Sequence, residues 1–230
     1  MNGTIHSTGR WRLIGLFPYC LFSFLPLLWL LLTSVKSREA SITTSLRLAP
    51  ESLDGFRRLG DVLPGTGFAF TGYLWNSVVI GLGSTVCAVV LGTACAYGFS
   101  RFAIPGAKDW LFFILSTRFM PPLAVVAPVL ILFRQFDLPN THLGLIVLYT
   151  AFNLSLAVWL MKGFIDELPK GYEEAALVDG YTRWQAFVRI IIPHSLPGIA
   201  VTAVFCLISS WNEYGFAMAL NNARAVTVPV

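Results

Sequence analysis

Two groups of residues in this 230-residue chain could do chemistry, and the first lies between positions 173 and 180. It combines paired carboxylates with small side chains: Glu173, Glu174, Ala175, Ala176, Asp179 and Gly180. Paired carboxylates act as general acid and base only where they converge in a pocket. Here they begin a short alanine-rich helix, where negative charge is favourable, and the glycine can end that helix in the left-handed conformation. The segment therefore predicts a flat docking surface flanked by charge, or alternatively a helix that lies on a membrane surface.

A second short helix is expected directly after this segment. Thr182, with Gln185 three residues later, has the pattern of a capping box that begins a helix. Apolar side chains then recur at helical spacing and predict one apolar face: Trp184, Phe187, Val188 and Ile191. We therefore interpret residues 164–195 as two capped helices joined at Gly180 and not as a flexible loop.

The second group consists of polar residues and prolines inside long apolar runs. Its members are Asn76, Arg118, Pro121, Pro122, Asn153, Trp211, Asn212 and Glu213. An arginine near the centre of a membrane helix costs roughly 2.5–3.5 kcal/mol, so Arg118 should face a bundle interior or reach toward the interface. Adjacent prolines should kink or break their helix, and broken helices in transporters often line the pathway. Glu213 and its neighbours suit sugar hydroxyls and a sugar ring, although hydrogen bonding between helices would also explain these residues.

The composition predicts the elements that position both groups. Hydrophobic residues make up 56% of the chain and charged residues 12%, against about 25% charge in soluble proteins; the mean hydropathy is +0.69. Five apolar runs have the length of roughly 20 residues that a bilayer requires, at about 13–33, 73–99, 110–133, 143–163 and 196–220. They should be helices, because backbone groups in lipid must form hydrogen bonds within their own segment. The sequence thus predicts one all-α membrane domain over residues 1–230.

The sequence gives no support for catalysis on this chain. The run Gly81-Leu82-Gly83-Ser84 lacks the lysine of a phosphate-binding loop. All four cysteines lie in apolar runs, without a CxxC pair or a nearby histidine, so we expect no metal. The net charge of +4 is scattered over the loops, so we expect no nucleic acid partner.

A family resemblance adds to this interpretation. The pattern Glu174-Ala175-Ala176, Gly180, Ile190 and Ile192-Pro193 resembles the EAA signature of prokaryotic ATP-binding-cassette importer permeases, with Ile192 where leucine is usual. In that family the loop is cytoplasmic, and its short coupling helix sits in a cleft of the ATPase subunit. The resemblance implies that Glu174 and Gly180 belong to this contact, and we assign Glu173, Ala175, Ala176 and Asp179 to it as well.

Further motifs resemble permeases of carbohydrate importers. They are Asn76-Ser77, Ala96 to Phe102, Arg118 before Pro121-Pro122, and Trp211-Asn212-Glu213. The most similar type is the second permease subunit of maltose-like, glycerol-phosphate-like and polyol importers, which usually has six spans. The resemblance implies a helical bundle of the type I importer permease fold. We count five of the six spans and expect that a sixth is missing after Val226–Val230.

The resemblance also implies the partners and the location. We expect a second permease subunit as a heterodimer, two ATPase subunits that bind ATP and Mg²⁺, and an extracytoplasmic solute-binding protein. The cargo would be a sugar or polyol, and the chain would cross the bacterial or archaeal cytoplasmic membrane several times. Loop charges are nearly balanced between the two sides. The cytoplasmic assignment of residues 164–195 therefore sets the orientation and places the N-terminus in the cytoplasm.

Three alternatives remain at this point. The signature at 174–193 is also compatible with an importer of an amino acid, a peptide or a phosphate ester. A stand-alone ion-coupled transporter would be expected to show an inverted repeat and coupling carboxylates, and we find no repeat. An intramembrane enzyme would need paired catalytic residues within the spans.

Overall fold

The computed structural model of the chain describes residues 7–37, 52–61, 69–221 and 225–228. Every regular element in these ranges is helical, which confirms the predicted all-α fold. One domain over residues 1–230 stays a prediction. The structure is described in two compact units, Met1–Thr71 and Gly72–Val230. The end of the chain, where we expect a missing span, lies partly outside the described residues.

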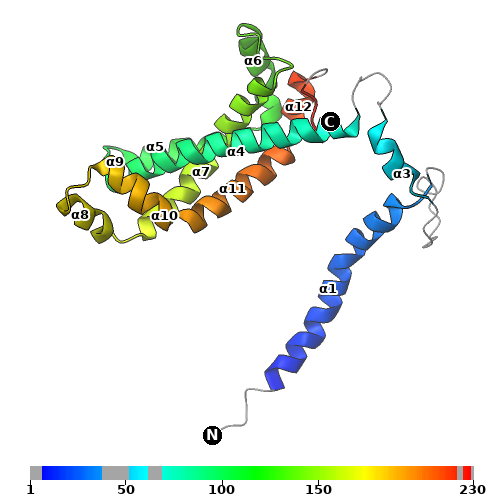
Figure 1. The fold of residues 1–230 in the computed structure, drawn as a ribbon, viewed down its shortest axis with the longest axis horizontal. Helices are drawn as coiled ribbons and strands as arrows, with labels where there is room; N and C mark the ends of the chain where they lie inside the picture. Colours follow the sequence, from blue (N-terminus) through cyan, green and yellow to red (C-terminus); the bar gives the residue numbers. More distant parts are fainter. Residues whose placement is uncertain (1–6, 38–51, 62–68, 222–224, 229–230) are drawn as a thin grey trace. The chain divides into compact units, whose positions relative to one another are not determined.

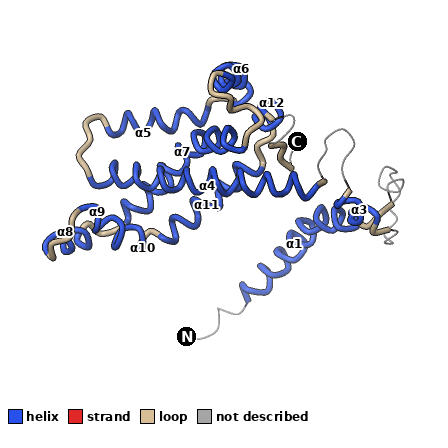
Figure 2. Tube along the Cα trace, turned by 45° about the horizontal axis from the view of Figure 1, so that its top comes forward, coloured by secondary structure: helices blue, strands red, loops and turns tan. Residues whose placement is uncertain are grey.

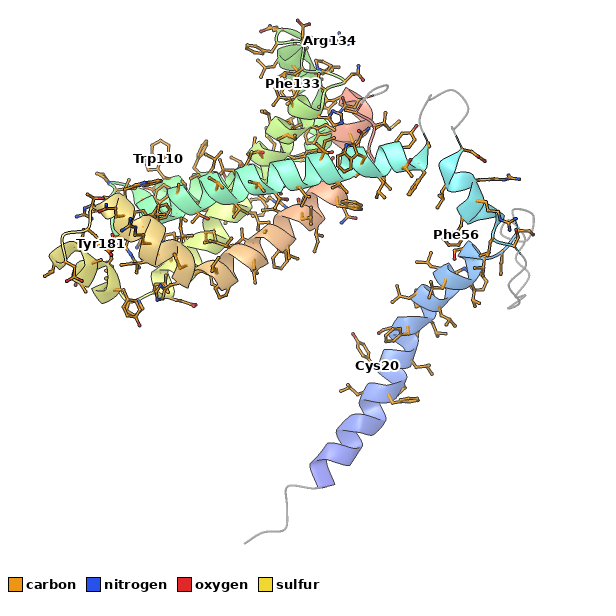
Figure 3. All side chains as sticks on the ribbon, viewed as in Figure 1. Cys20, Phe56, Trp110, Phe133, Arg134 and Tyr181 are labelled. Carbon is orange, nitrogen blue, oxygen red and sulfur yellow. The ribbon has the colours of Figure 1, made fainter. Side chains whose placement is uncertain are left out.

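The first unit is dominated by one apolar helix, α1 (Ser7–Ser34). It is followed by the short α3 (Asp54–Arg57) and η1 (Arg58–Gly60). The large apolar side chains of α1 from Leu16 to Leu31 are exposed and stand out from the helix, as Figure 3 shows around Cys20. An exposed apolar helix of this length can cross a bilayer, because lipid is the solvent that such side chains prefer.

The second unit is a bundle built around three helices (Figures 1 and 2). They are α4 (Phe70–Arg101), α7 (His142–Glu167) and α11 (Leu196–Trp211). Helices α4 and α7 approach closely where Gly92 meets Ala157, since a Cβ atom on the glycine would lie 2.5 Å from the alanine Cβ. Cys206 of α11 joins the same buried cluster. Small residues thus allow the close helix packing that replaces the hydrophobic effect in membranes.

The run predicted at 110–133 is broken, as its adjacent prolines suggest. It consists of α5 (Ala107–Ser116), η2 (Thr117–Phe119) and α6 (Pro122–Arg134). Pro121 has an extended backbone, and the proline after it occupies the first turn of α6, where a missing N–H costs nothing. Figure 3 labels Phe133 and Arg134 near the end of α6, the first buried and the second exposed.

The run predicted at 196–220 is not one helix, which corrects our interpretation. Helix α11 ends at Trp211, and a separate helix, α12 (Gly215–Leu220), follows. The side-chain amide of Asn212 donates to the Ile208 carbonyl at 2.8 Å, and a Glu213 carboxylate oxygen accepts from the Phe216 N–H at 3.0 Å. These short polar side chains compete for helix backbone groups, which ends one helix and begins the next.

Within the described residues, three helices are long and apolar enough to cross a membrane. The number of candidate spans rises to as many as five if each of two bent helix pairs is counted as one span. Two of these three helices, α4 and α7, contain the runs predicted at 73–99 and 143–163 and extend beyond them at both ends. The length and composition of these helices are consistent with a polytopic membrane protein.

Residues 164–195 contain the predicted helical segments. The end of α7 leads into α8 (Gly171–Val178), α9 (Arg183–Ala186), a π-helix η3 (Phe187–Ile191) and α10 (Ile192–His194). The predicted apolar face is only half right: Phe187 and Ile191 are buried, but Trp184 and Val188 are exposed. The wider π turn breaks the spacing that would put all four side chains on one face. The π-helix ends two residues before Pro193, which has no N–H to continue an α-helix.

Candidate functional site

The C-terminal cap of α8 forms as the sequence predicts. Gly180 has φ +87°, in the left-handed region that favours glycine. Its N–H donates to the Leu177 carbonyl at 3.2 Å, and the Tyr181 N–H donates to the Ala176 carbonyl at 3.0 Å. This pair of bonds is a Schellman motif, which satisfies two carbonyls at the end of the helix. The chain therefore leaves α8 at a fixed angle.

The start of α9 is also fixed by its own sequence. The Thr182 hydroxyl accepts from the Gln185 N–H at 3.2 Å, and the Gln185 side chain accepts from the Thr182 N–H at 2.8 Å. This is the predicted capping box. Because α8 ends and α9 begins with defined caps, the two helices form one ordered segment.

The six residues predicted to face the ATPase divide between two faces of α8. Glu174, Ala175, Asp179 and Gly180 are exposed. Glu173 and Ala176 are buried, with 4% of each residue exposed, so the structure does not place them on the outer surface. The most prominent apolar side chain on that surface is Val178, which is 87% exposed and which the sequence analysis did not single out.

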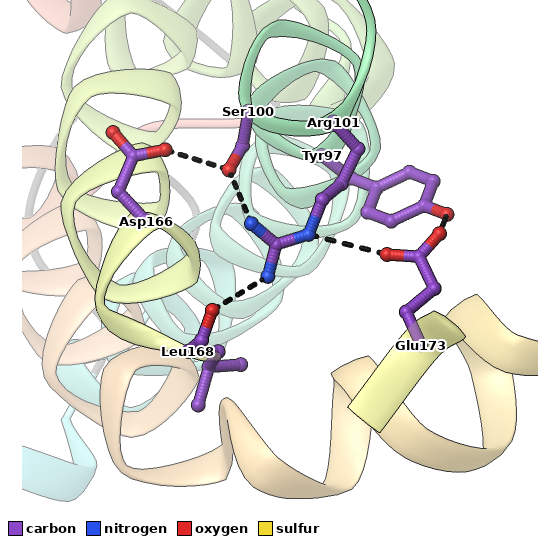
Figure 4. A network of polar contacts seen from close by, with 6 residues as sticks. All are labelled: Tyr97, Ser100, Arg101, Asp166, Leu168 and Glu173. Carbon is purple, nitrogen blue, oxygen red and sulfur yellow. Dashed lines mark hydrogen bonds and ion pairs between the residues drawn. The ribbon is translucent and has the colours of Figure 1, made fainter. Parts of the chain in front are cut away.

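The buried Glu173 is held by the end of α4 (Figure 4). One carboxylate oxygen accepts a hydrogen bond from the Tyr97 hydroxyl, and the other pairs with Arg101 Nε at 3.2 Å. The arginine also donates through Nη2 to the Leu168 carbonyl at 3.0 Å. Sequence reasoning missed these contacts because more than 60 residues separate the partners, although Ala96–Phe102 was part of the resemblance.

A second layer of polar contacts ties α4 to the end of α7. Arg101 Nη1 donates to the Ser100 hydroxyl at 3.2 Å, and this hydroxyl donates to Asp166 at 2.6 Å (Figure 4). Asp166 also pairs with Lys162 one turn earlier on α7. The cluster thus joins α4, α7 and α8 through charge-assisted hydrogen bonds, the stronger kind in a protein.

Aromatic rings pack against the same point from the α9 side. The Tyr97 ring lies 4.6 Å from the Phe187 ring and 5.9 Å from the Phe102 ring, measured between centroids. The Arg183 guanidinium lies over the Phe102 ring at 5.3 Å. The end of α4 is therefore in contact with α8 and with η3.

A polar cavity lies elsewhere in the bundle, between η2, α7 and the break after α11. Its volume is about 170 Å³. Its lining combines charged, polar and aromatic side chains: Arg118, Met120, Tyr149, Phe152, Asn153, Ser209, Ser210, Glu213 and Phe216. Such a mixture of ring faces, donors and acceptors suits a small hydroxylated ligand.

Arg118 reaches across this cavity to two helices. Its Nη1 donates to the Phe152 carbonyl at 3.2 Å and to the Asn153 side chain at 3.3 Å, and its Nη2 donates to the Ser209 hydroxyl at 3.2 Å. Asn153 in turn donates to the Ser210 hydroxyl at 2.8 Å. Within the described residues neither Arg118 nor Glu213 takes part in an ion pair. The cavity therefore offers one cation and one anion that are not neutralised by each other.

The structure brings together three of the eight predicted pathway residues: Arg118, Asn153 and Glu213. Asn76 instead binds the Val226 carbonyl at 2.9 Å and His142 Nε2 at 2.8 Å, away from the cavity. The cavity lining does not include Pro121, Trp211 or Asn212. The side chain of Pro122 lies outside the described residues.

Other lining residues were not predicted. Tyr149 and Phe152 lie at i and i+3 on α7, with the predicted Asn153 at i+4, so all three share one face of the helix. The adjacent hydroxyls of Ser209 and Ser210 near the end of an apolar helix were the corresponding signal on α11. Among the described residues, no three His, Cys, Asp or Glu side chains form a group that could hold a metal ion.

Comparisons with known proteins place the chain in a family. Residues 88–227 match the binding-protein-dependent transport system inner membrane component. The trehalose transport system permease protein SugB of Mycobacterium tuberculosis is 34% identical over 91% of this chain and 75% of its own length. The diacetylchitobiose uptake system permease protein NgcG of Streptomyces coelicolor is 32% identical over 85% of this chain and 64% of its own.

A solved structure similar to this chain also belongs to a transporter. A chain of a bacterial ABC transporter that imports the acidic polysaccharide alginate is 25% identical, with a TM-score of 0.74 over 96% of this chain and 76% of that chain. The predicted type I permease fold is thus confirmed. The chain belongs to the family of binding-protein-dependent transport system inner membrane components, the permease subunits of ATP-binding-cassette importers.

Proposed function

We propose that this chain is a permease subunit through which an ATP-driven importer moves a sugar or polyol across the cytoplasmic membrane. The observation that carries the proposal is the ordered α8–α9 segment, whose outer face exposes Glu174 and Ala175 beside the glycine cap. The relatives include permeases named for trehalose and for diacetylchitobiose transport, which supports a sugar as cargo.

The outer face of α8 is the proposed contact with an ATPase subunit. Its exposed residues are Glu174, Ala175, Val178, Asp179 and Gly180. The alanine and glycine let a partner backbone approach closely, the valine offers an apolar anchor, and the two carboxylates offer charge at both ends of the helix. Helix α8 would then sit in a cleft of the ATPase, with the α8 end of the bundle in the cytoplasm.

ATP would act through the partners. Two ATPase subunits that close on ATP and Mg²⁺ would draw two coupling helices together, one from this chain and one from a second permease subunit. A ligand shifts such an equilibrium only by its differential affinity for the two states, so ATP must favour the closed pair. An extracytoplasmic binding protein would deliver the cargo. The N-terminus of this chain would lie in the cytoplasm.

The cavity around Arg118 is the proposed part of the translocation pathway on this chain. Its volume of about 170 Å³ is smaller than the roughly 300–1,000 Å³ of most ligand pockets. A second permease subunit would have to supply the remaining wall. Arg118 would donate to sugar hydroxyls and Glu213 would accept from them, while Phe152 and Phe216 would face the ring.

The test is transport by the complete importer. This chain is assembled in vesicles with its partner permease, the ATPase and the binding protein, and uptake of labelled trehalose, maltose and glycerol is compared with uptake of an amino acid and a phosphate ester. We expect ATP-dependent uptake of a carbohydrate only. Uptake of the amino acid or the phosphate ester in place of any carbohydrate would overturn the cargo, and the absence of ATP dependence would overturn the importer role.

A further inference from the structure

Glu173 is unusual among the residues of the coupling segment. Its side chain is 6% exposed and that of its partner Arg101 is 5% exposed, although both residues lie at a helix end. Glu174, the next residue along the chain, is exposed. The two adjacent carboxylates therefore point in opposite directions, one toward the proposed ATPase and one into the subunit.

All hydrogen-bonding nitrogens of Arg101 and both oxygens of Glu173 have partners. The arginine donates to Glu173, to the Ser100 hydroxyl and to the Leu168 carbonyl. The second oxygen of the carboxylate accepts from Tyr97. Figure 4 shows that these groups come from three elements, with α8 on one side and the ends of α4 and α7 on the other.

Such an arrangement resists separation of α8 from α4. Removing one charge from a buried pair leaves the other charge uncompensated, which is much more costly than the loss of an exposed pair. A ring contact of α8, Tyr172 on His194 at 5.4 Å between centroids, reaches α10 and not α4. The ion pair is therefore the contact that fixes both the distance and the direction between the two helices.

We propose that the Arg101–Glu173 ion pair carries the displacement of α8 into α4, so that both residues position the coupling helix from inside the subunit and Glu173 is not an ATPase contact. This inference rests on the proposed importer function. A movement imposed on α8 by the ATPase would reach α4 through the pair and α7 through the Leu168 carbonyl. Without the pair, α8 could move with the ATPase while α4 and α7 keep their positions.

The experiment measures whether a nucleotide-driven movement of α8 reaches the cavity, and it does not require that the cargo be known. The reporter is a Met120→Cys thiol, which lines the cavity, in a chain whose four native cysteines are replaced by alanine. The complete importer is treated with ATP and vanadate, and the rate of alkylation of the thiol by N-ethylmaleimide is compared with and without nucleotide. ATPase activity and co-purification of the ATPase are measured on the same sample.

In the reporter chain we expect nucleotide to change the alkylation rate. Glu173→Gln keeps the shape of the side chain but removes the charge. It should bring the ratio of the alkylation rates with and without nucleotide toward 1. ATP hydrolysis and ATPase co-purification should persist. Glu167→Gln, at an exposed glutamate on α7, is the matched control and should respond as the reporter chain does.

Several results would overturn the proposal. A full nucleotide response in Glu173→Gln would show that the pair transmits nothing, and loss of the ATPase would make Glu173 a docking residue. Arg101→Gln with Glu173→Gln should be no worse than the poorer single variant, and additive losses would contradict a shared role. If Glu173→Gln does not fold, Tyr97→Phe removes one hydrogen bond only, and its response must still fall. A reporter chain without any response would instead overturn the importer role.

Discussion

The left-handed glycine at the end of α8 allows the sharpest quantitative prediction. Gly180 has φ +87°, and a Cβ atom added there would meet nothing within 4 Å. Gly180→Ala therefore creates no steric clash with neighbouring residues. Its cost is the intrinsic penalty of an L-residue in the left-handed region, about 1–2 kcal/mol. A change of that size lowers the population of the capped state relative to the uncapped state by roughly 5- to 30-fold.

The cap can be measured directly by hydrogen exchange. The amides of residues 180 and 181 are protected by the carbonyls of Leu177 and Ala176, at 3.2 Å and 3.0 Å. Exchange of these amides in Gly180→Ala should accelerate by roughly 5- to 30-fold, since protection follows the free energy of local opening. Gly180→Asn should accelerate less, because asparagine tolerates this conformation better than alanine does.

The matched control for the cap is Gly98→Ala. Gly98 lies inside α4, its added Cβ also meets nothing within 4 Å, and it has no positive φ. Gly98→Ala should not accelerate exchange, because alanine is more stable than glycine in the interior of a helix. If Gly180→Ala exchanges at the rate of the unsubstituted chain, the reasoning is refuted.

Gly180→Pro also deletes the N–H and forces a negative φ, so it should uncouple uptake from ATP hydrolysis in vesicles. Unchanged uptake with that variant would contradict the role of the cap in coupling.

Three further predictions concern other positions. Glu174→Lys reverses a charge on the exposed face of α8, so less ATPase should co-purify with it; undiminished recovery would argue against docking at this face. Glu213→Ala removes an acceptor from the cavity and should lower sugar uptake while the ATPase stays bound; normal uptake would leave Glu213 only as the cap of α12. Asn153→Ala removes one hydrogen bond from Arg118 and one from the Ser210 hydroxyl, so thermal unfolding should show a loss of about 1–3 kcal/mol, and an unchanged melting temperature would contradict this expectation.

Local chemistry made part of the coupling segment predictable. The Schellman cap at Gly180 and the capping box of Thr182 and Gln185 depend on residues within a few positions of each other, so the sequence contains all that they need. The break at Pro121 follows from the missing N–H of proline and was predicted for the same reason.

Two errors have a common physical cause. The apolar face through Trp184 and Val188 assumes 3.6 residues per turn, and the π-helix before Pro193 changes that number. The single span at 196–220 assumes that an apolar run continues through Asn212 and Glu213, whose side chains instead bind the backbone. Both departures arise from backbone hydrogen bonding, which hydropathy alone does not report.

Contacts between distant segments could not be read from the pattern. Glu173 stands beside Glu174 in sequence, and nothing local distinguishes the buried carboxylate from the exposed one. The difference arises only when α7 turns at Leu168 and brings α8 back to Arg101. The cavity has the same origin, since Arg118 meets Asn153 and Ser209 from two other helices.

Helix α4 is the element that connects the two sites. Arg101 at its end holds α8, and Ser84 in its middle lies 3.1 Å from the hydroxyl of Ser210, which binds Asn153 at the cavity. The 17 positions from 84 to 101 correspond to about 26 Å of helix. Close packing at Gly92 ties α4 to α7 between these points, so bending of α4 there would require the two backbones to separate. A displacement of α8 should therefore reach the cavity as a rigid movement of α4 and α7 together, because the tight contact leaves less room for either helix to bend than to move with its neighbour.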